Sequence, residues 1–164
     1  MRVLPKPMNK GAVAMSSEEN KALVLALYEQ IWNAGNLALI TERVSLERID
    51  HDPGGPAAGE VAGQQELIDS VESYRTAFPD LHFEFGPQVA DDELVATRWT
   101  ARGTNLGSLD ERPPTGKAIE VTGMFLERLV SRKIVESWVE YDQLGLLRQL
   151  GRITEEAADA RQPG

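Results

Sequence analysis

The chain has 164 residues, of which 41% are hydrophobic, a length and composition that suit one domain with a sizeable core. It contains no cysteine, which excludes disulfides, thiolate catalysis and zinc–thiolate sites. Its net charge of −9 argues against a surface for nucleic acids or anionic membranes, and its two histidines are too few for a multi-histidine metal site. No apolar run approaches the length of a membrane span, so we expect a cytoplasmic protein with no metal or cofactor.

The chain ends differ in composition from the middle. Residues 1–16 contain prolines and lysines without a continuous apolar core, which indicates a poorly ordered leader rather than a signal peptide. Residues 17–151 carry the periodic patterns of one domain, without a repeat or a second domain. Residues 152–164 form a polar tail.

The first helix has a clear start signal. The segment Ser16 to Glu19 matches the S-x-x-E capping box, in which two side chains bind the free backbone N–H groups of a helix start. Beyond it, Leu23, Leu27 and Ile31 fall on one helical stripe. The pattern predicts an amphipathic helix with one buried face.

Two further helices follow. Gly35 is expected to end the first helix, and Asn36 to cap a shorter one over Leu37 to Val44. A third helix is expected from about Gln64 to Phe78, where Pro79 stops it.

After this proline the hydrophobic period changes from a helical one to two, which is typical of strands. The expected order is therefore helices first and then an antiparallel meander of four long strands. A short strand or loop edge is expected at Glu47 to His51. The long strands are expected around residues 81–85, 94–102, 118–129 and 134–141.

The strand over residues 118–129 is apolar on both faces. Val121 and Phe125 lie on one face, which we expect to pack on the helices, and Met124 and Leu126 lie on the other. An apolar outer face predicts a homodimer formed through that side of the sheet. The long loop from Asn105 to Gly116 is expected to act as a lid over a pocket or as part of the dimer interface.

The last strand has the most unusual face. Alternation places Glu136, Trp138, Glu140 and Asp142 together, and burying three carboxylates in a dry core would be costly. The pattern therefore predicts that this face lines a wet, partly apolar pocket, and that the chemistry occurs there.

The order of several short motifs resembles the SnoaL-like polyketide cyclase family, within the cone-shaped fold of nuclear transport factor 2 and ketosteroid isomerase. The resemblance covers residues 21–151. The motifs are His51-Asp52-Pro53, Ala77-Phe78-Pro79-Asp80-Leu81, Arg102-Gly103-Thr104, Pro114-Thr115-Gly116-Lys117, Glu136-Ser137-Trp138, Tyr141-Asp142 and Leu147-Arg148-Gln149-Leu150-Gly151.

This resemblance implies an α+β fold in which three N-terminal helices pack in a curved antiparallel sheet of four long strands and a short one. A short C-terminal helix completes it. The resemblance further implies a cofactor-independent cyclase that closes a ring of a polyketide-like or other carbonyl compound by intramolecular aldol condensation. Two alternatives remain on the same fold: an isomerase or an enzyme that activates water, such as an epoxide hydrolase or hydratase, and a ligand-binding or dimeric interaction domain without catalysis.

The family pattern places a general base at the end of the last strand, where this chain has Asp142. Two roles stay open for this residue: apolar neighbours would strengthen it as a base, but it also directly precedes the apolar segment 144–150 and can cap a helix there. His51 is expected to hold a substrate carbonyl or to pair with Asp142, or else to pair with Asp52 at the pocket rim. In the loop after Gly103-Thr104, members of the family often carry a histidine, and this chain has Asn105 instead.

Aromatic side chains are expected to form the pocket walls, with core packing as the alternative role. Glu140 shares the predicted face with Asp142, and either positions the substrate or pairs with Arg98 or Arg102, as Glu136 would. The expected wall residues are Tyr28, Trp32, Tyr74, Trp99, Phe125 and Trp138.

Overall fold

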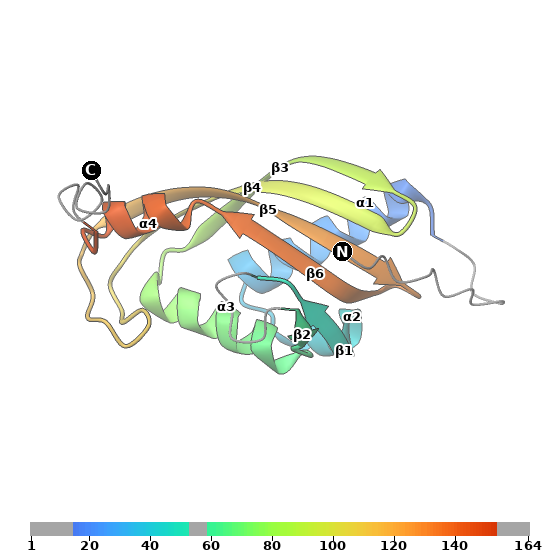
Figure 1. Ribbon diagram of the computed structural model, residues 1–164, viewed down its shortest axis with the longest axis horizontal. Helices are drawn as coiled ribbons and strands as arrows, with labels where there is room; N and C mark the ends of the chain where they lie inside the picture. Colours follow the sequence, from blue (N-terminus) through green and yellow to red (C-terminus); the bar gives the residue numbers. More distant parts are fainter. Residues whose placement is uncertain (1–14, 53–58, 154–164) are drawn as a thin grey trace, which may run out of the picture.

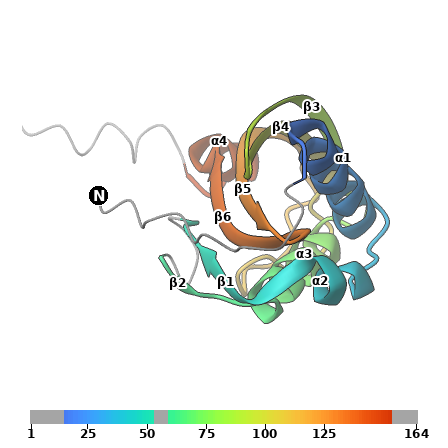
Figure 2. The same cartoon turned by 90° about the vertical axis from the view of Figure 1, so that its right-hand side faces the viewer.

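A computed structural model describes residues 15–52 and 59–153, so the predicted leader and tail lie almost wholly outside the described residues. The chain forms an α+β fold in which a curved sheet wraps around helices (Figures 1 and 2). The strands are β1 (Val44–Asp50), β2 (Glu60–Val61), β3 (His82–Asp91), β4 (Leu94–Thr104), β5 (Ala118–Val130) and β6 (Lys133–Tyr141). The helical segments are α1 (Ser17–Tyr28), the π-helical η1 (Glu29–Asn33), α2 (Ala38–Arg43), α3 (Gln65–Ala77) and α4 (Gln143–Gln149).

The predicted fold class is confirmed, but the sheet differs in two details. It has six strands in the order β2-β1-β6-β5-β4-β3, and it is mixed because β1 runs parallel to β6. The segment expected to be a short strand or loop edge is the full strand β1. This strand is difficult to recognise from sequence because two of its buried side chains, Arg48 and Asp50, are charged.

The predicted start of the first helix is confirmed. The Ser16 hydroxyl accepts the backbone N–H of Glu19 at 3.3 Å, and the Glu19 carboxylate accepts the Ser16 N–H at 2.8 Å. Gly35 has φ = +70°, a left-handed conformation that suits glycine. The prediction for the next helix was wrong in one detail: Leu37 occupies the N-cap position of α2, and no side chain caps that end.

The long loop after β4 is fixed at its base by a buried amide. The side chain of Asn105 accepts the backbone N–H of Thr115 at 2.9 Å and donates to the carbonyl of Ala77 at 3.3 Å. The loop is therefore tied to the end of α3, and its role as a lid stays a prediction.

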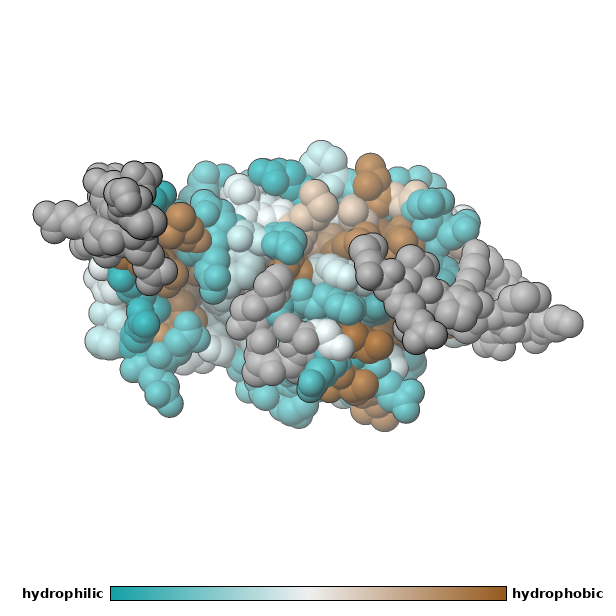
Figure 3. Space-filling model, in the orientation of Figure 1, coloured by the Kyte–Doolittle hydropathy of each residue, from teal (hydrophilic) through white to brown (hydrophobic). Residues whose placement is uncertain are grey.

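The sheet has an inner face toward the helices and an outer face. Thr97, Trp99 and Ala101 are buried on the inner face of β4, as their alternation predicts. On the outer face Met124 is 45% exposed and Val89 is 70% exposed. Figure 3 shows hydrophobic residues over the right-hand half of the molecule and a further group near its left-hand end. Within residues 15–52 and 59–153, none of the helices combines the length and apolar character needed to cross a membrane.

The homodimer through this outer face stays a prediction. Light scattering should give a dimer mass at micromolar concentration, because pairing the two copies removes these apolar side chains from water. Met124→Asp, an exposed position in the middle of β5, should shift the dimer toward monomer without unfolding it. A monomer in the unmodified protein would contradict the prediction.

Candidate active site

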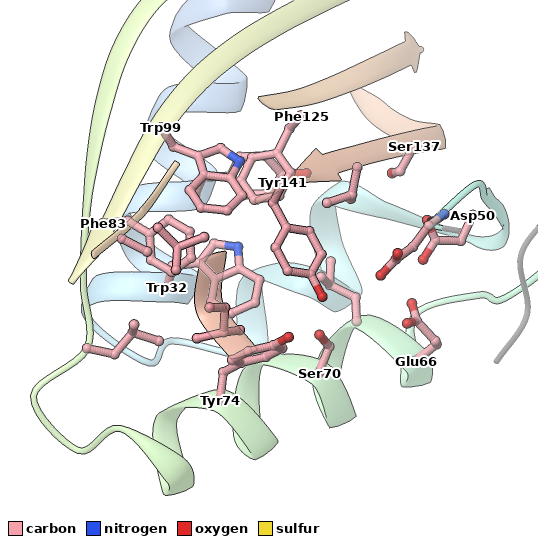
Figure 4. Close-up of a pocket in the computed structure, with 18 of the residues that line it drawn as sticks. Trp32, Asp50, Glu66, Ser70, Tyr74, Phe83, Trp99, Phe125, Ser137 and Tyr141 are labelled. Carbon is pink, nitrogen blue, oxygen red and sulfur yellow. Dashed lines mark hydrogen bonds between the residues drawn. The ribbon is translucent and has the colours of Figure 1, made fainter. Parts of the chain in front are cut away.

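A cavity lies between α3 and the inner face of the sheet (Figure 4). Its empty volume, which includes the open space at its mouth, is about 870 Å³. The walls are mostly aromatic and aliphatic, with polar groups concentrated toward one end. The aromatic lining residues are Tyr28, Trp32, Tyr74, Phe78, Phe83, Trp99, Phe125 and Tyr141.

The aromatic wall depends on a close pairing between β4 and β5. Trp99 lies opposite Gly123 in the strand register, and a Cβ at position 123 would stand 2.2 Å from the indole ring. The missing side chain lets the indole lie flat on the strand. There it packs against Phe83 and Phe125, with ring centroids 5.1 and 5.3 Å away.

The opposite wall is formed by the π-helical segment η1. Trp32 lies within it, 4.8 Å from the ring of Phe83 and 6.3 Å from that of Tyr74. A π-turn inserts an extra residue into a helix and is frequently found at functional sites. Here it directs a large aromatic side chain toward the sheet.

A cluster of charged side chains lines one end of the cavity. Arg48 and Asp50 come from β1, and Glu66 comes from the first turn of α3. The Arg48 guanidinium lies 2.5 Å from Glu66 and 3.5 Å from Asp50, and the arginine also donates to the carbonyl of Gly63. The arginine thus holds two carboxyl groups together at the protein–cavity boundary.

The pKa of Glu66 is shifted strongly. Burial, and then the hydrogen bond and negative charge of Asp50, raise the pKa of Glu66 from 4.5 to about 7, although Arg48 opposes the shift. Glu66 can therefore hold or release a proton near neutral pH, beside the carboxyl group of Asp50. Such a shift beside a cavity indicates a functional site.

A third carboxyl group, that of Glu127, lies fully buried in the cavity wall. The hydroxyls of Tyr28 and Ser137 both donate to it, the latter at 2.6 Å. Burial outweighs these hydrogen bonds and raises the pKa of Glu127 from 4.5 to about 7. Its satisfied hydrogen bonds are typical of a structural group that fixes the wall.

Between the two ends of the cavity lie Tyr74 and Tyr141, whose hydroxyls point toward each other (Figure 4). Burial raises the pKa of both phenols, so both remain neutral hydrogen-bonding groups. Within residues 15–52 and 59–153, no three Asp, Glu or His side chains gather in a way that could hold a metal ion.

The structure brings five of the predicted wall residues to the cavity. Each lies in the lining, and their roles in binding a substrate stay predictions. They are Tyr28, Trp32, Tyr74, Trp99 and Phe125.

The predicted orientation of the last strand was wrong. Ser137, Val139 and Tyr141 line the cavity, so Trp138 and Glu140 point to the opposite face. The charged side chains of this strand are partly or fully accessible to solvent there, which removes the burial cost that suggested a pocket.

His51 and Trp138 form a cluster on that outer face rather than in the cavity. Their rings stack with centroids 4.8 Å apart, and His51 Nε2 lies 3.0 Å from the carboxylate of Glu136. Arg128 donates to the same carboxylate at 2.7 Å, so the pairing expected with Arg98 or Arg102 is made instead by this arginine. The predicted contact between His51 and a substrate in the cavity is therefore not supported.

Asp142 is exposed and caps α4. Its carboxylate accepts the backbone N–H of Gly145 at 2.8 Å, and it is not among the residues that line the cavity. Of the two roles left open for this residue, the structure contains the cap. The carboxylate lies so close to Gly145 that a Cβ there would be 2.0 Å from an Asp142 oxygen. This explains why position 145 is occupied by glycine.

Sequence reasoning missed the polar groups that the cavity does contain. Glu127 had a detectable signal, because it occupies an inward position between Phe125 and Leu129 in the β5 alternation. Arg48 and Asp50 also alternate in β1. No local sequence pattern indicated that these two residues contact Glu66, since Asp50 and Glu66 are 16 positions apart in the chain.

Residues 22–150 match the model of a protein family described as SnoaL-like polyketide cyclase. The chain belongs to this family. The resemblance drawn from the motifs is thereby confirmed over most of the domain. Among curated proteins, no sequence matches the chain.

Several solved structures of SnoaL-like proteins are similar to this member of the family. IdmH from Streptomyces antibioticus, assigned as a polyketide cyclase, is 30% identical with a TM-score of 0.71, covering 81% of this chain and 99% of IdmH. AclR from Streptomyces galilaeus, assigned as a hydroxylase, is 27% identical with a TM-score of 0.73, covering 85% and 100%. A protein assigned as a polyketide cyclase from Acidithiobacillus ferrooxidans is 26% identical with a TM-score of 0.74, at the same coverages.

Proposed function

We propose that this SnoaL-like protein is a cofactor-independent enzyme that removes a proton beside a carbonyl group of a small, largely apolar molecule. The resulting enol then attacks a second carbonyl of the same molecule and closes a ring. The observation that carries the proposal is the pair of carboxyl groups, Asp50 and Glu66, that Arg48 holds at one end of an aromatic cavity, with the pKa of Glu66 raised to about 7. The family and its neighbours assigned as polyketide cyclases support this class of reaction.

In this proposal Asp50 is the general base and Glu66 the general acid. The carboxylate of Asp50 takes the proton from carbon, while protonated Glu66 donates to the carbonyl oxygen as negative charge develops on it. Arg48 is a positioning residue, since its guanidinium holds both carboxyl groups at the cavity edge. The aromatic walls exclude water and hold the substrate chain in the folded shape that ring closure needs.

This assignment moves the aspartate base from Asp142 to Asp50. Asp50 lines the cavity and is 6% exposed, whereas Asp142 is exposed and occupied as a helix cap. Both are aspartates next to the last strand, because β1 pairs with β6 and places Asp50 opposite Ser137.

Removal of the proton beside the carbonyl group, the first step of the proposed reaction, can be tested without the natural substrate. In deuterated buffer, the protein should accelerate exchange of the C1 protons of 2-tetralone, a bicyclic ketone whose C–H bonds beside the carbonyl are acidic. Proton NMR measures the loss of the C1 signal over time. Binding without accelerated exchange would favour a non-catalytic domain and would overturn the proposal.

A further inference from the structure

Two donors in the cavity wall have no partner. The indole nitrogens of Trp32 and Trp99 are buried, and neither N–H donates to any group in the part of the chain that the structure describes. The two side chains are 6% and 5% exposed, and both belong to the cavity lining. Buried donors are nearly always paired in folded proteins, so two orphans in one cavity call for an acceptor from outside the chain.

The directions of both indoles are fixed by packing. Trp99 is seated on Gly123 and pressed between Phe83 and Phe125. Trp32 is carried by the π-helical turn and lies against the ring of Phe83. Because these contacts hold the rings, neither N–H can turn to a protein acceptor without rearranging the aromatic wall.

The two indoles lie at the end of the cavity away from the carboxyl pair. Figure 4 shows Trp32 and Trp99 on one side of Tyr141, with both indole nitrogens turned toward the interior, and Asp50 and Glu66 on the other side. The cavity therefore has two polar poles, with the hydroxyls of Tyr74 and Tyr141 between them. The carboxyl pole can exchange protons, whereas the indole pole can only donate hydrogen bonds.

We infer that the indole N–H groups of Trp32 and Trp99 bind a second acceptor oxygen of the substrate, remote from the carbonyl that reacts at Asp50. This inference rests on the proposed function and deepens it. The substrate class is a mainly apolar molecule that carries, besides the two carbonyls that react, a further carbonyl oxygen at its far end. A substrate whose group at the indole end only donates hydrogen bonds would leave both indole donors unpaired and would be rejected.

The distal oxygen also sets the orientation of the substrate. With its far carbonyl held by the two indoles, the reacting end is presented to Asp50 rather than reversed in the cavity. An indole N–H is a neutral donor that does not titrate in the physiological range, so this anchor is independent of pH.

Two probes that differ in one group test the inference. They are 6-acetyl-2-tetralone and 6-isopropenyl-2-tetralone, in which a C=CH₂ group replaces the distal C=O with nearly the same shape. The acetyl compound should bind about tenfold more tightly, as measured by calorimetry, because only it offers an acceptor to the buried donors.

The three tryptophans of the chain provide a direct spectroscopic readout. In a ¹⁵N–¹H spectrum, the indole protons of Trp32 and Trp99 should move downfield with the acetyl compound and not with the isopropenyl compound. Trp138 stacks on His51 outside the cavity and serves as an internal reference. Trp32→Phe and Trp99→Phe assign the signals, and each should reduce the tenfold preference to about threefold.

Equal affinities of the two probes, with unmoved indole signals, would overturn the inference. That result leaves the proposed function intact if exchange at C1 of 2-tetralone is still accelerated. Conversely, a tenfold preference and shifted indole signals without any exchange would support the binding pole and contradict the proposed chemistry. Because the spectrum is recorded on the unmodified protein, a variant that fails to fold does not remove the test.

Discussion

Replacing Glu66 with Gln should slow α-proton exchange in 2-tetralone by about 100-fold or more, the usual contribution of a positioned acid or base. The amide keeps the size of the side chain and can still contact Arg48, but it cannot give up a proton. Asp50→Asn should cause a loss of at least the same size, since it removes the proposed base. NMR exchange rates at saturating 2-tetralone measure both effects.

The pH profile gives a second signature of Glu66. Its pKa is raised to about 7, and the proposed acid acts when protonated, so the exchange rate should fall as the pH rises through about 7. In Glu66→Gln this decline should disappear. A rate that instead rises through the same range would assign Glu66 the role of a base and contradict its role as the acid.

Two variants separate this site from other carboxyl groups. Glu72→Gln changes an exposed glutamate on the same helix, α3, and should leave the exchange rate unchanged. Asp142→Asn tests the competing base. Asparagine is also a good N-cap, so the fold should be kept, and full activity is expected because Asp142 does not line the cavity. A 100-fold loss in Asp142→Asn with unchanged activity in Asp50→Asn would reverse the assignment.

Glu127→Gln should flatten the dependence of stability on pH. The pKa of this buried carboxyl is raised from 4.5 in the unfolded chain to about 7 in the folded protein, so folding favours its protonated form. This stabilisation is fully present below pH 4.5 and is lost as the pH rises through about 7. The loss amounts to about 3 kcal/mol, since one pKa unit corresponds to about 1.4 kcal/mol.

The measurement is urea unfolding of both proteins at pH 5 and pH 8. Glu66 contributes a loss of the same sign, so the relevant quantity is the difference between wild type and variant rather than either slope alone. Glutamine can accept from Tyr28 and donate to Ser137, which keeps the wall hydrogen-bonded. Glu140→Gln, an exposed change on β6, is the matched control, and an equal flattening there would contradict the role of Glu127.

The fold could be predicted largely from local patterns, whereas the polar site could not. The capping box at Ser16, the stop at Pro79 and the alternation around Trp99 each depend on neighbours within a few residues, and each predicted its element. The orientation of β6 depends instead on which face the helices cover, and alternation alone is identical for both faces. Because burying three carboxylates in a dry core would be costly, the charged face of β6 was assigned to the pocket, and this assignment was wrong.

The carboxyl pair illustrates the second limit. Asp50 raises the pKa of Glu66 only because β1 pairs with β6 and α3 packs against the sheet, which brings the two carboxyl groups together. Neither residue has a hydrophobic or cap signal of its own. A sequence pattern can identify an amphipathic element, but the pKa of a side chain depends on the distant groups that folding brings near it.

Because the indole of Trp99 on β4 lies over Gly123 on β5, the two positions together determine where this wall of the cavity lies. Any side chain at position 123 must displace the indole, and any smaller residue at position 99 leaves unfilled space over the glycine. A Cβ at position 123 would also stand 2.7 Å from the backbone oxygen of Glu140, so a smaller residue at position 99 does not by itself make room for a side chain on β5. The wall is therefore open to change only from β4, where a smaller residue at position 99 would widen the cavity while Gly123 and the carboxyl pair stay as they are, and this offers a route to catalysts of this family that accept rings of a different shape.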